Sequence, residues 1–133
     1  MSSPTTAGRV AAVDLGEVRC GIAISDETAT IARPLEVVGE REIEERLRGL
    51  IDREGVSVVV VGVPKTMRGE EGPQARKVLE KIGRMRERFP AVRFVEWDER
   101  LTTRLAGDGK KKGPVDHLAA AHMLQEYLWA RRS

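Results

Sequence analysis

Short apolar runs recur along the chain and predict a sheet of five strands. They lie at residues 9–16, 19–26, 31–38, 56–63 and 92–97. Only a short turn separates the first two runs, so we expect the first two strands to be antiparallel. Pro34 places the third strand near an edge of the sheet. The fourth run is almost entirely β-branched, which is typical of a strand buried on both faces.

Three other segments follow a helical period. Apolar residues in the segment 40–54 share one face, and Gly55 stands where a helix commonly ends. Pro73 suits the first turn of a second helix, and Asp116 begins a third. A helix between two strands indicates a right-handed crossover and a parallel pair. The predicted order is β-β-β-α-β-α-β-α, an α/β fold with a mixed sheet and helices on both faces.

The composition fits one small domain. The chain has 133 residues, of which 41% are hydrophobic, and no apolar run approaches the roughly 20 residues of a membrane span. We expect residues 1–8 to form a flexible polar tail, with no signal peptide, and residues 9–133 to form a single domain. The lone Cys20 cannot form an internal disulfide, which favours a cytoplasmic location.

The charges are distributed unevenly. Residues 1–63 hold 7 Lys and Arg against 11 Asp and Glu, whereas residues 64–133 hold 16 against 10. A basic excess in one half indicates a polyanionic partner, most commonly nucleic acid. The alternative is an ordinary solvated surface of mixed charge.

Four acids stand at the ends of predicted elements. Asp14 ends the first strand, Asp98 and Glu99 end the fifth, and Asp116 begins the last helix on its apolar face. Acids that converge there would repel one another unless a divalent cation bound between them, and Mg²⁺ or Mn²⁺ prefers such oxygen ligands. Alternatively, Asp14 forms a turn, Asp116 interacts with the helix dipole, and the other two pair with Arg100.

Several residues near these acids are candidates for contact with phosphate. Gly16 and Gly62 either end their strands or let a phosphate approach the sheet edge. Arg19 and Lys65 are possible phosphate partners or simple surface charges. Trp97 and Trp129 could stack on bases, but we expect them to pack in the core.

Four sequence motifs resemble those of the YqgF/RuvX family, in the same order. They are residues 14–26, residues 62–64 followed by 69–75, residues 98–103, and residues 116–120. The resemblance implies a ribonuclease H-like fold, which has the predicted element order. It also implies a nuclease, since members are named as pre-16S rRNA nucleases and, earlier, as Holliday junction resolvases.

The resemblance further implies roles for the acids. Asp14, one of Asp98 and Glu99, and Asp116 would bind Mg²⁺ or Mn²⁺ in a two-metal phosphodiester hydrolase. We favour Glu99, because in a regular strand it shares a face with Val95 and Trp97. The candidate substrate-binding residues are Gly16, Arg19, Lys65, Arg68, Arg100, Thr102, Lys110, Lys111, Lys112 and His117.

Some of these positions depart from the family pattern. Thr66 and Arg68 replace a common asparagine and aspartate, and His117 replaces a small residue. We expect the partner to be nucleic acid, namely pre-rRNA, branched or single-stranded DNA, or both, and a ribosomal subunit precursor is a further candidate partner. We expect the protein to act as a monomer or a homodimer without membrane contact. The leading hypothesis is maturation of the 5′ end of pre-16S rRNA. The alternatives are a junction resolvase-like DNA nuclease and a non-cleaving assembly factor.

Overall fold

The five predicted strands form one mixed sheet. The computed structural model describes residues 8–65, 68–99 and 117–132. The strands are β1 (Arg9–Leu15), β2 (Arg19–Ser25), β3 (Ala32–Gly39), β4 (Val56–Val63) and β5 (Arg93–Asp98). They lie in the order β3-β2-β1-β4-β5, so β1 is central and β3, which contains Pro34, is at an edge, as predicted.

The sheet is mixed because β2 runs against the direction of the other strands. β1 and β3 both run antiparallel to β2. β4 runs parallel to both β1 and β5. The strands β1, β3, β4 and β5 therefore point the same way, and their carboxyl ends meet at one edge of the sheet. Ligands of such sheets commonly bind beyond that edge.

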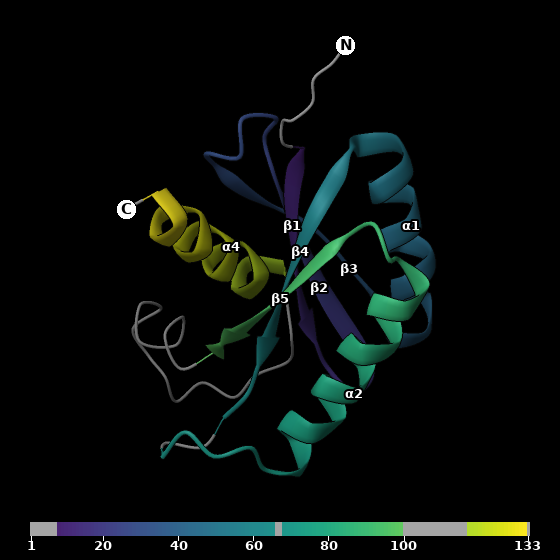
Figure 1. Ribbon diagram of the computed structural model, residues 1–133, viewed down its shortest axis with the longest axis vertical. Coiled ribbons are helices and arrows are strands. Elements are labelled where there is room, and N and C mark those ends of the chain that lie inside the picture. Colours follow the sequence, from purple (N-terminus) through teal and green to yellow (C-terminus); the bar gives the residue numbers. More distant parts are fainter. Residues whose placement is uncertain (1–7, 66–67, 100–116, 133) are drawn as a thin grey trace.

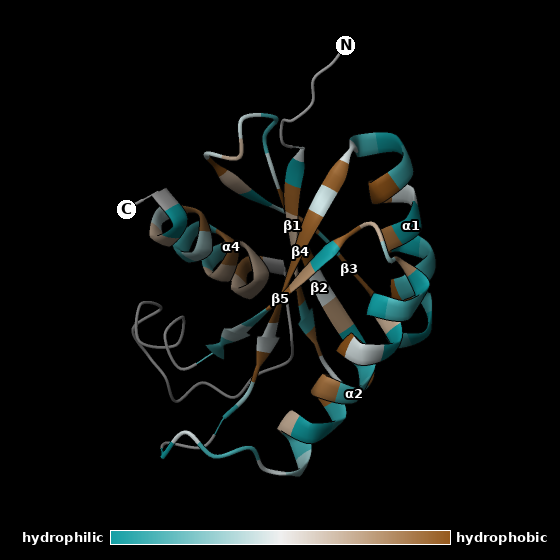
Figure 2. Cartoon of the chain, viewed as in Figure 1, coloured by the Kyte–Doolittle hydropathy of each residue, from teal (hydrophilic) through white to brown (hydrophobic). Residues whose placement is uncertain are grey.

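Helices cover both faces of the sheet (Figure 1). The helices are α1 (Ile43–Glu54), α2 (Pro73–Arg88) and α4 (His117–Arg132). α1 and α2 pack on one face, with a core that includes Val13, Leu47 and Ile82. α4 packs on the other face, with a core that includes Ala12, Val60 and Leu124. Figure 2 shows the apolar strands between helices whose outer surfaces are polar.

The helix ends follow the sequence signals, with one difference. Gly55 has a left-handed φ of 73° and ends α1, and Pro73 begins α2. The segment predicted as one helix from residue 40 instead begins with the 3-10 turn η1 (Glu40–Glu42). The Glu42 carboxylate there accepts a hydrogen bond from the Gly39 backbone N–H at 3.1 Å. That contact tightens the turn where the chain leaves β3.

Gln125 attaches α4 to the turn between β2 and β3. Its Oε1 accepts a hydrogen bond from the Ala32 N–H at 2.9 Å, and its Nε2 donates one to the Thr30 carbonyl at 3.0 Å. These bonds fix the rotation of α4 about its axis over the sheet. Within the described parts of the chain, no helix is long and apolar enough to cross a membrane.

Candidate active site

Asp14 lies near the carboxyl end of the central strand and points toward the α4 side of the sheet. Side chains alternate along β1, and Val10 and Ala12 pack in the core beneath α4. Asp14 therefore projects from the same face. Gly21 is its partner on β2, and Gly62 follows Val61, the partner of Val13, on β4. A glycine on each side leaves space around this carboxylate.

Glu99 occupies the space that Gly62 leaves. A Cβ added at Gly62 would lie 2.5 Å from Glu99 Oε2, 2.8 Å from Glu99 Cγ and 3.0 Å from Met123 Sδ. Gly62 thus makes room for a carboxylate from the end of β5, with α4 closing the site above it. The expectation that a bare Gly62 could admit a phosphate needs correction, because Glu99 and Met123 fill that space.

The Glu99 and Asp14 carboxyl groups interact directly. Burial raises the pKa of Glu99 to about 8, and the negative charge of Asp14 and a hydrogen bond to Asp14 add to the increase. A smaller contribution comes from the charge of Asp98. Two carboxyl groups this close need a proton or a cation between them.

The structure separates the two acids at the end of β5. Phe94 packs in the core beneath α1 and α2, whereas Val95 and Trp97 pack on the α4 side. Alternation along β5 places Asp98 on the face of Phe94. Glu99 follows the strand, and its carboxyl lies against Gly62 on the face of Asp14. Glu99 is therefore the acid from the end of β5 that lies beside Asp14.

The residues present fit a divalent cation. The fold family implies a divalent metal, and Asp14 and Glu99 offer carboxylate oxygens, the donors that hard cations prefer. Within residues 8–65, 68–99 and 117–132, no group of three or more metal-binding side chains comes together. The third candidate ligand, Asp116, lies outside the described residues.

The candidate substrate-binding residues are only partly placed. The Gly16 N–H donates to the Arg19 carbonyl at 3.0 Å, closing the β1–β2 turn beside Asp14. Arg19 and Arg68 are exposed, and Lys65 is half-buried just after β4. His117 is the first residue of α4. The others lie outside the described residues, namely Arg100, Thr102, Lys110, Lys111 and Lys112.

Two further expectations concern the tryptophans and the cysteine. Trp97 packs edge-on against Tyr127, with ring centroids 6.0 Å apart. Trp129 is 57% exposed, so its predicted place in the core is wrong. Trp129 lies on the outer side of α4. Because the sequence of this helix is apolar on both sides, it does not indicate which side faces the sheet. Cys20 is buried on β2, and burial raises the pKa of its thiol.

Comparisons with known proteins agree with this fold. The fold resembles that of Thermus thermophilus RuvC in complex with a Holliday junction substrate, with a TM-score of 0.59 and 22% identity over 95% of this chain and 96% of that one. The strand order and this likeness define the class, a ribonuclease H-like α/β fold.

Sequence comparison then identifies the family. The model of the RuvX family, described as Holliday junction resolvase, matches residues 8–130. A "Putative pre-16S rRNA nuclease" of Rubrobacter xylanophilus is 56% identical, with 96% of both chains covered. One of Desulforudis audaxviator is 39% identical, over 94% of this chain and 96% of that one. The chain therefore belongs to the RuvX family of nucleases, which confirms the resemblance seen in its motifs.

Proposed function

We propose that the protein is a Mg²⁺- or Mn²⁺-dependent nuclease that cleaves pre-16S rRNA during maturation of its 5′ end. One observation carries the proposal. Asp14 and Glu99, from strands adjacent to β4 on either side, meet at the carboxyl edge of the sheet, in space that Gly62 leaves open. A buried pair of acids lacks a stabilising role of its own, because like charges repel and burial penalises them.

Each residue has a definite part in the proposed reaction. Asp14 and Glu99 would hold the cation, with Asp116, which directly precedes α4 in the sequence, as a third ligand. A cation bound there supplies an activated water and stabilises charge on the phosphate. Gly62 and Met123 keep the Glu99 carboxylate beside Asp14. Arg19 at the adjacent turn, and the lysines at positions 110–112, would bind backbone phosphates without reading the base sequence.

The choice of pre-rRNA rests on the relatives named for that activity, which span nearly the whole chain. The cytoplasm, where rRNA is processed in bacteria, is the proposed location, and a ribosomal subunit precursor is a proposed partner. A four-way DNA junction is the second candidate substrate, because the family model is described as a Holliday junction resolvase.

The test compares acid variants on both substrates. Wild type, Asp14→Asn, Glu99→Gln and Asp98→Asn are incubated with Mg²⁺ or Mn²⁺ and either a single-stranded pre-16S rRNA fragment or a four-way DNA junction. We expect Asp14→Asn and Glu99→Gln to lose at least about 10²-fold in cleavage rate, since each removes a ligand. Asp98→Asn is the matched control, because Asp98 points to the opposite face and should retain cleavage.

Binding measured without metal separates catalysis from affinity. Asp14→Asn should bind RNA as well as or better than wild type, because a negative charge near phosphate is removed. Full cleavage by Asp14→Asn would refute the site. Binding without cleavage of either substrate by wild type would instead support a non-cleaving assembly factor.

A further inference from the structure

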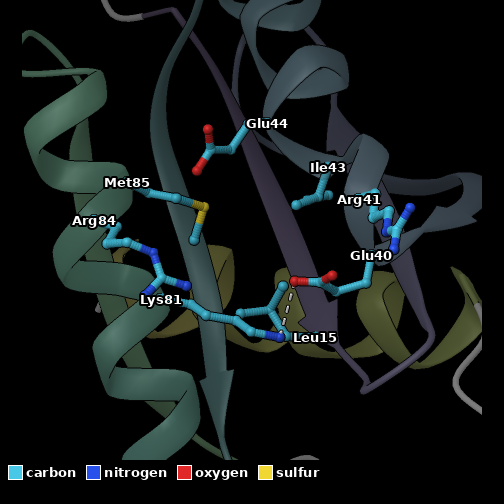
Figure 3. Close-up of a pocket in the computed structure, with 8 residues that line it drawn as sticks. All are labelled: Leu15, Glu40, Arg41, Ile43, Glu44, Lys81, Arg84 and Met85. Carbon is cyan, nitrogen blue, oxygen red and sulfur yellow. Dashed lines mark ion pairs between the residues drawn. The ribbon is translucent and has the colours of Figure 1, made fainter.

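A second charged site lies on the opposite face of the sheet from the acid pair. A groove of about 180 Å³ runs between η1 and α1 on one side and α2 on the other. Its residues are Leu15, Glu40, Arg41, Ile43, Glu44, Lys81, Arg84 and Met85. Its apolar residues come from β1, α1 and α2, and its charged side chains come from η1, α1 and α2 (Figure 3).

The acids of the groove are already neutralised. Lys81 Nζ lies 3.2 Å from Glu40 Oε2, and this pair spans the groove (Figure 3). Glu44 Oε1 lies 3.3 Å from Arg88 Nη1. Among the described residues, no carboxylate forms an ion pair with Arg41 or Arg84. The groove therefore carries an excess of positive charge that a bound anion would balance.

Arg84 and Lys81 stand together on this wall. They are three residues apart on α2, a spacing at which helical side chains are neighbours, and Figure 3 shows Arg84 extending beside Lys81. Arg84 is exposed, and within the described residues its guanidinium forms no hydrogen bond or ion pair. A guanidinium beside an ammonium is a donor set suited to phosphate oxygens.

The groove and the acid pair lie on opposite faces of the sheet at the same end of β1. Leu15 faces the groove and directly follows Asp14, which faces α4, so the two sites flank the carboxyl end of β1. Lys77 continues the basic side of α2 toward the β1–β2 turn, where its Nζ lies 4.0 Å from Glu17 Oε2.

We propose that the groove between η1–α1 and α2 binds a backbone phosphate of the substrate strand, through Arg84 and Lys81 with Arg41 at the rim. The nucleic acid then bends over the end of β1, with the scissile phosphate on the α4 face and a phosphate a few nucleotides away in the groove. This inference rests on the proposed nuclease function.

The experiment measures the salt dependence of RNA binding. Fluorescence anisotropy follows a labelled single-stranded RNA with wild type, Arg84→Ala, Arg84→Lys and Arg33→Ala, in chelator and without divalent metal. Arg84→Ala should flatten the log–log salt slope by about 0.7 and weaken binding about five-fold at 0.1 M salt, as expected for one lost phosphate contact. Arg84→Lys should restore most of the slope. Arg33 is exposed on β3 at the opposite edge, so Arg33→Ala should match wild type.

The outcomes separate this proposal from the nuclease assignment. An unchanged slope in Arg84→Ala, in a protein that cleaves RNA, would overturn the groove and leave the function standing. A flattened slope in a protein that does not cleave would support the groove and count against the function. Titration with inorganic phosphate tests the other source of this ligand. If wild type binds phosphate tightly, Arg84→Ala abolishes that binding, and the salt slope of RNA binding is unchanged in the variant, the groove is a site for free phosphate instead.

Discussion

Replacing Gly62 by alanine tests the geometry of the acid pair most directly. The new Cβ would lie 2.5 Å from Glu99 Oε2 and 2.8 Å from Glu99 Cγ, so the side chain of Glu99 must move by about 1 Å to reach ordinary contact. Gly62 has no left-handed φ, and the backbone therefore accepts alanine without strain. The whole effect comes from the displaced carboxylate and from Met123.

The expected cost falls more on activity than on stability. Glu99 and Met123 are both flexible, so overpacking should cost only about 1 kcal/mol of unfolding free energy, the low end of the usual range. A displacement of about 1 Å at a reacting centre commonly reduces the rate about 10²-fold. The assay is kcat/KM for RNA cleavage beside urea denaturation. Gly49→Ala is the control, because a Cβ there meets nothing within 4 Å.

A double-mutant cycle distinguishes this contact from a general defect. With Glu99→Ala already present, Gly62→Ala should add little further loss of stability, since the main clashing partner is gone. The coupling free energy should be about 0.5 kcal/mol or more. Strictly additive costs, or a Gly62→Ala enzyme with wild-type cleavage, would show that Glu99 does not fill this space.

Two other predictions concern stability. The raised pKa of Glu99 means that its folded form holds a proton that the unfolded chain releases near pH 4.5. The contribution of Glu99 to the unfolding free energy without metal should therefore be largest below about pH 4.5 and fall as the pH rises to about 8, by a few kcal/mol at most. The difference in unfolding free energy between wild type and Glu99→Gln should show this fall, and a difference that does not change with pH would contradict the burial of the carboxyl. Gln125→Ala should cost about 1–3 kcal/mol in urea denaturation, because the Thr30 carbonyl and Ala32 N–H lose their partner. His122→Ala on the exposed side of α4 should cost less than about 0.5 kcal/mol, and equal losses in both would show that Gln125 does not anchor the helix.

Local signals in the sequence were sufficient for most of the fold. Short apolar runs placed the strands, and Gly55 and Pro73 marked helix ends at the positions where the structure has them. The short turn after Asp14 predicted the antiparallel β1–β2 pair. Such signals depend on neighbours within a few residues, which is why they can be read without the tertiary structure. The same signals missed the 3-10 turn η1 and the exposure of Trp129, because both depend on what packs against the helix.

The site depended on contacts between distant segments. That Asp14 ends the first strand follows from the sequence, but its proximity to Glu99 requires β1 to be central and β5 to pair with β4 in a defined register. The role of Gly62 could not be predicted, since the side chain that fills its space lies 37 positions further along the chain. Likewise, the sequence shows Lys81 and Arg84 only as basic residues of one helix. The packing of α2 beside η1 is what places them in a groove. The sequence determined which chemical groups are present and in which elements they lie. Tertiary packing decided which of these groups share a site, because strand register and helix placement, rather than spacing along the chain, determine which side chains come close together.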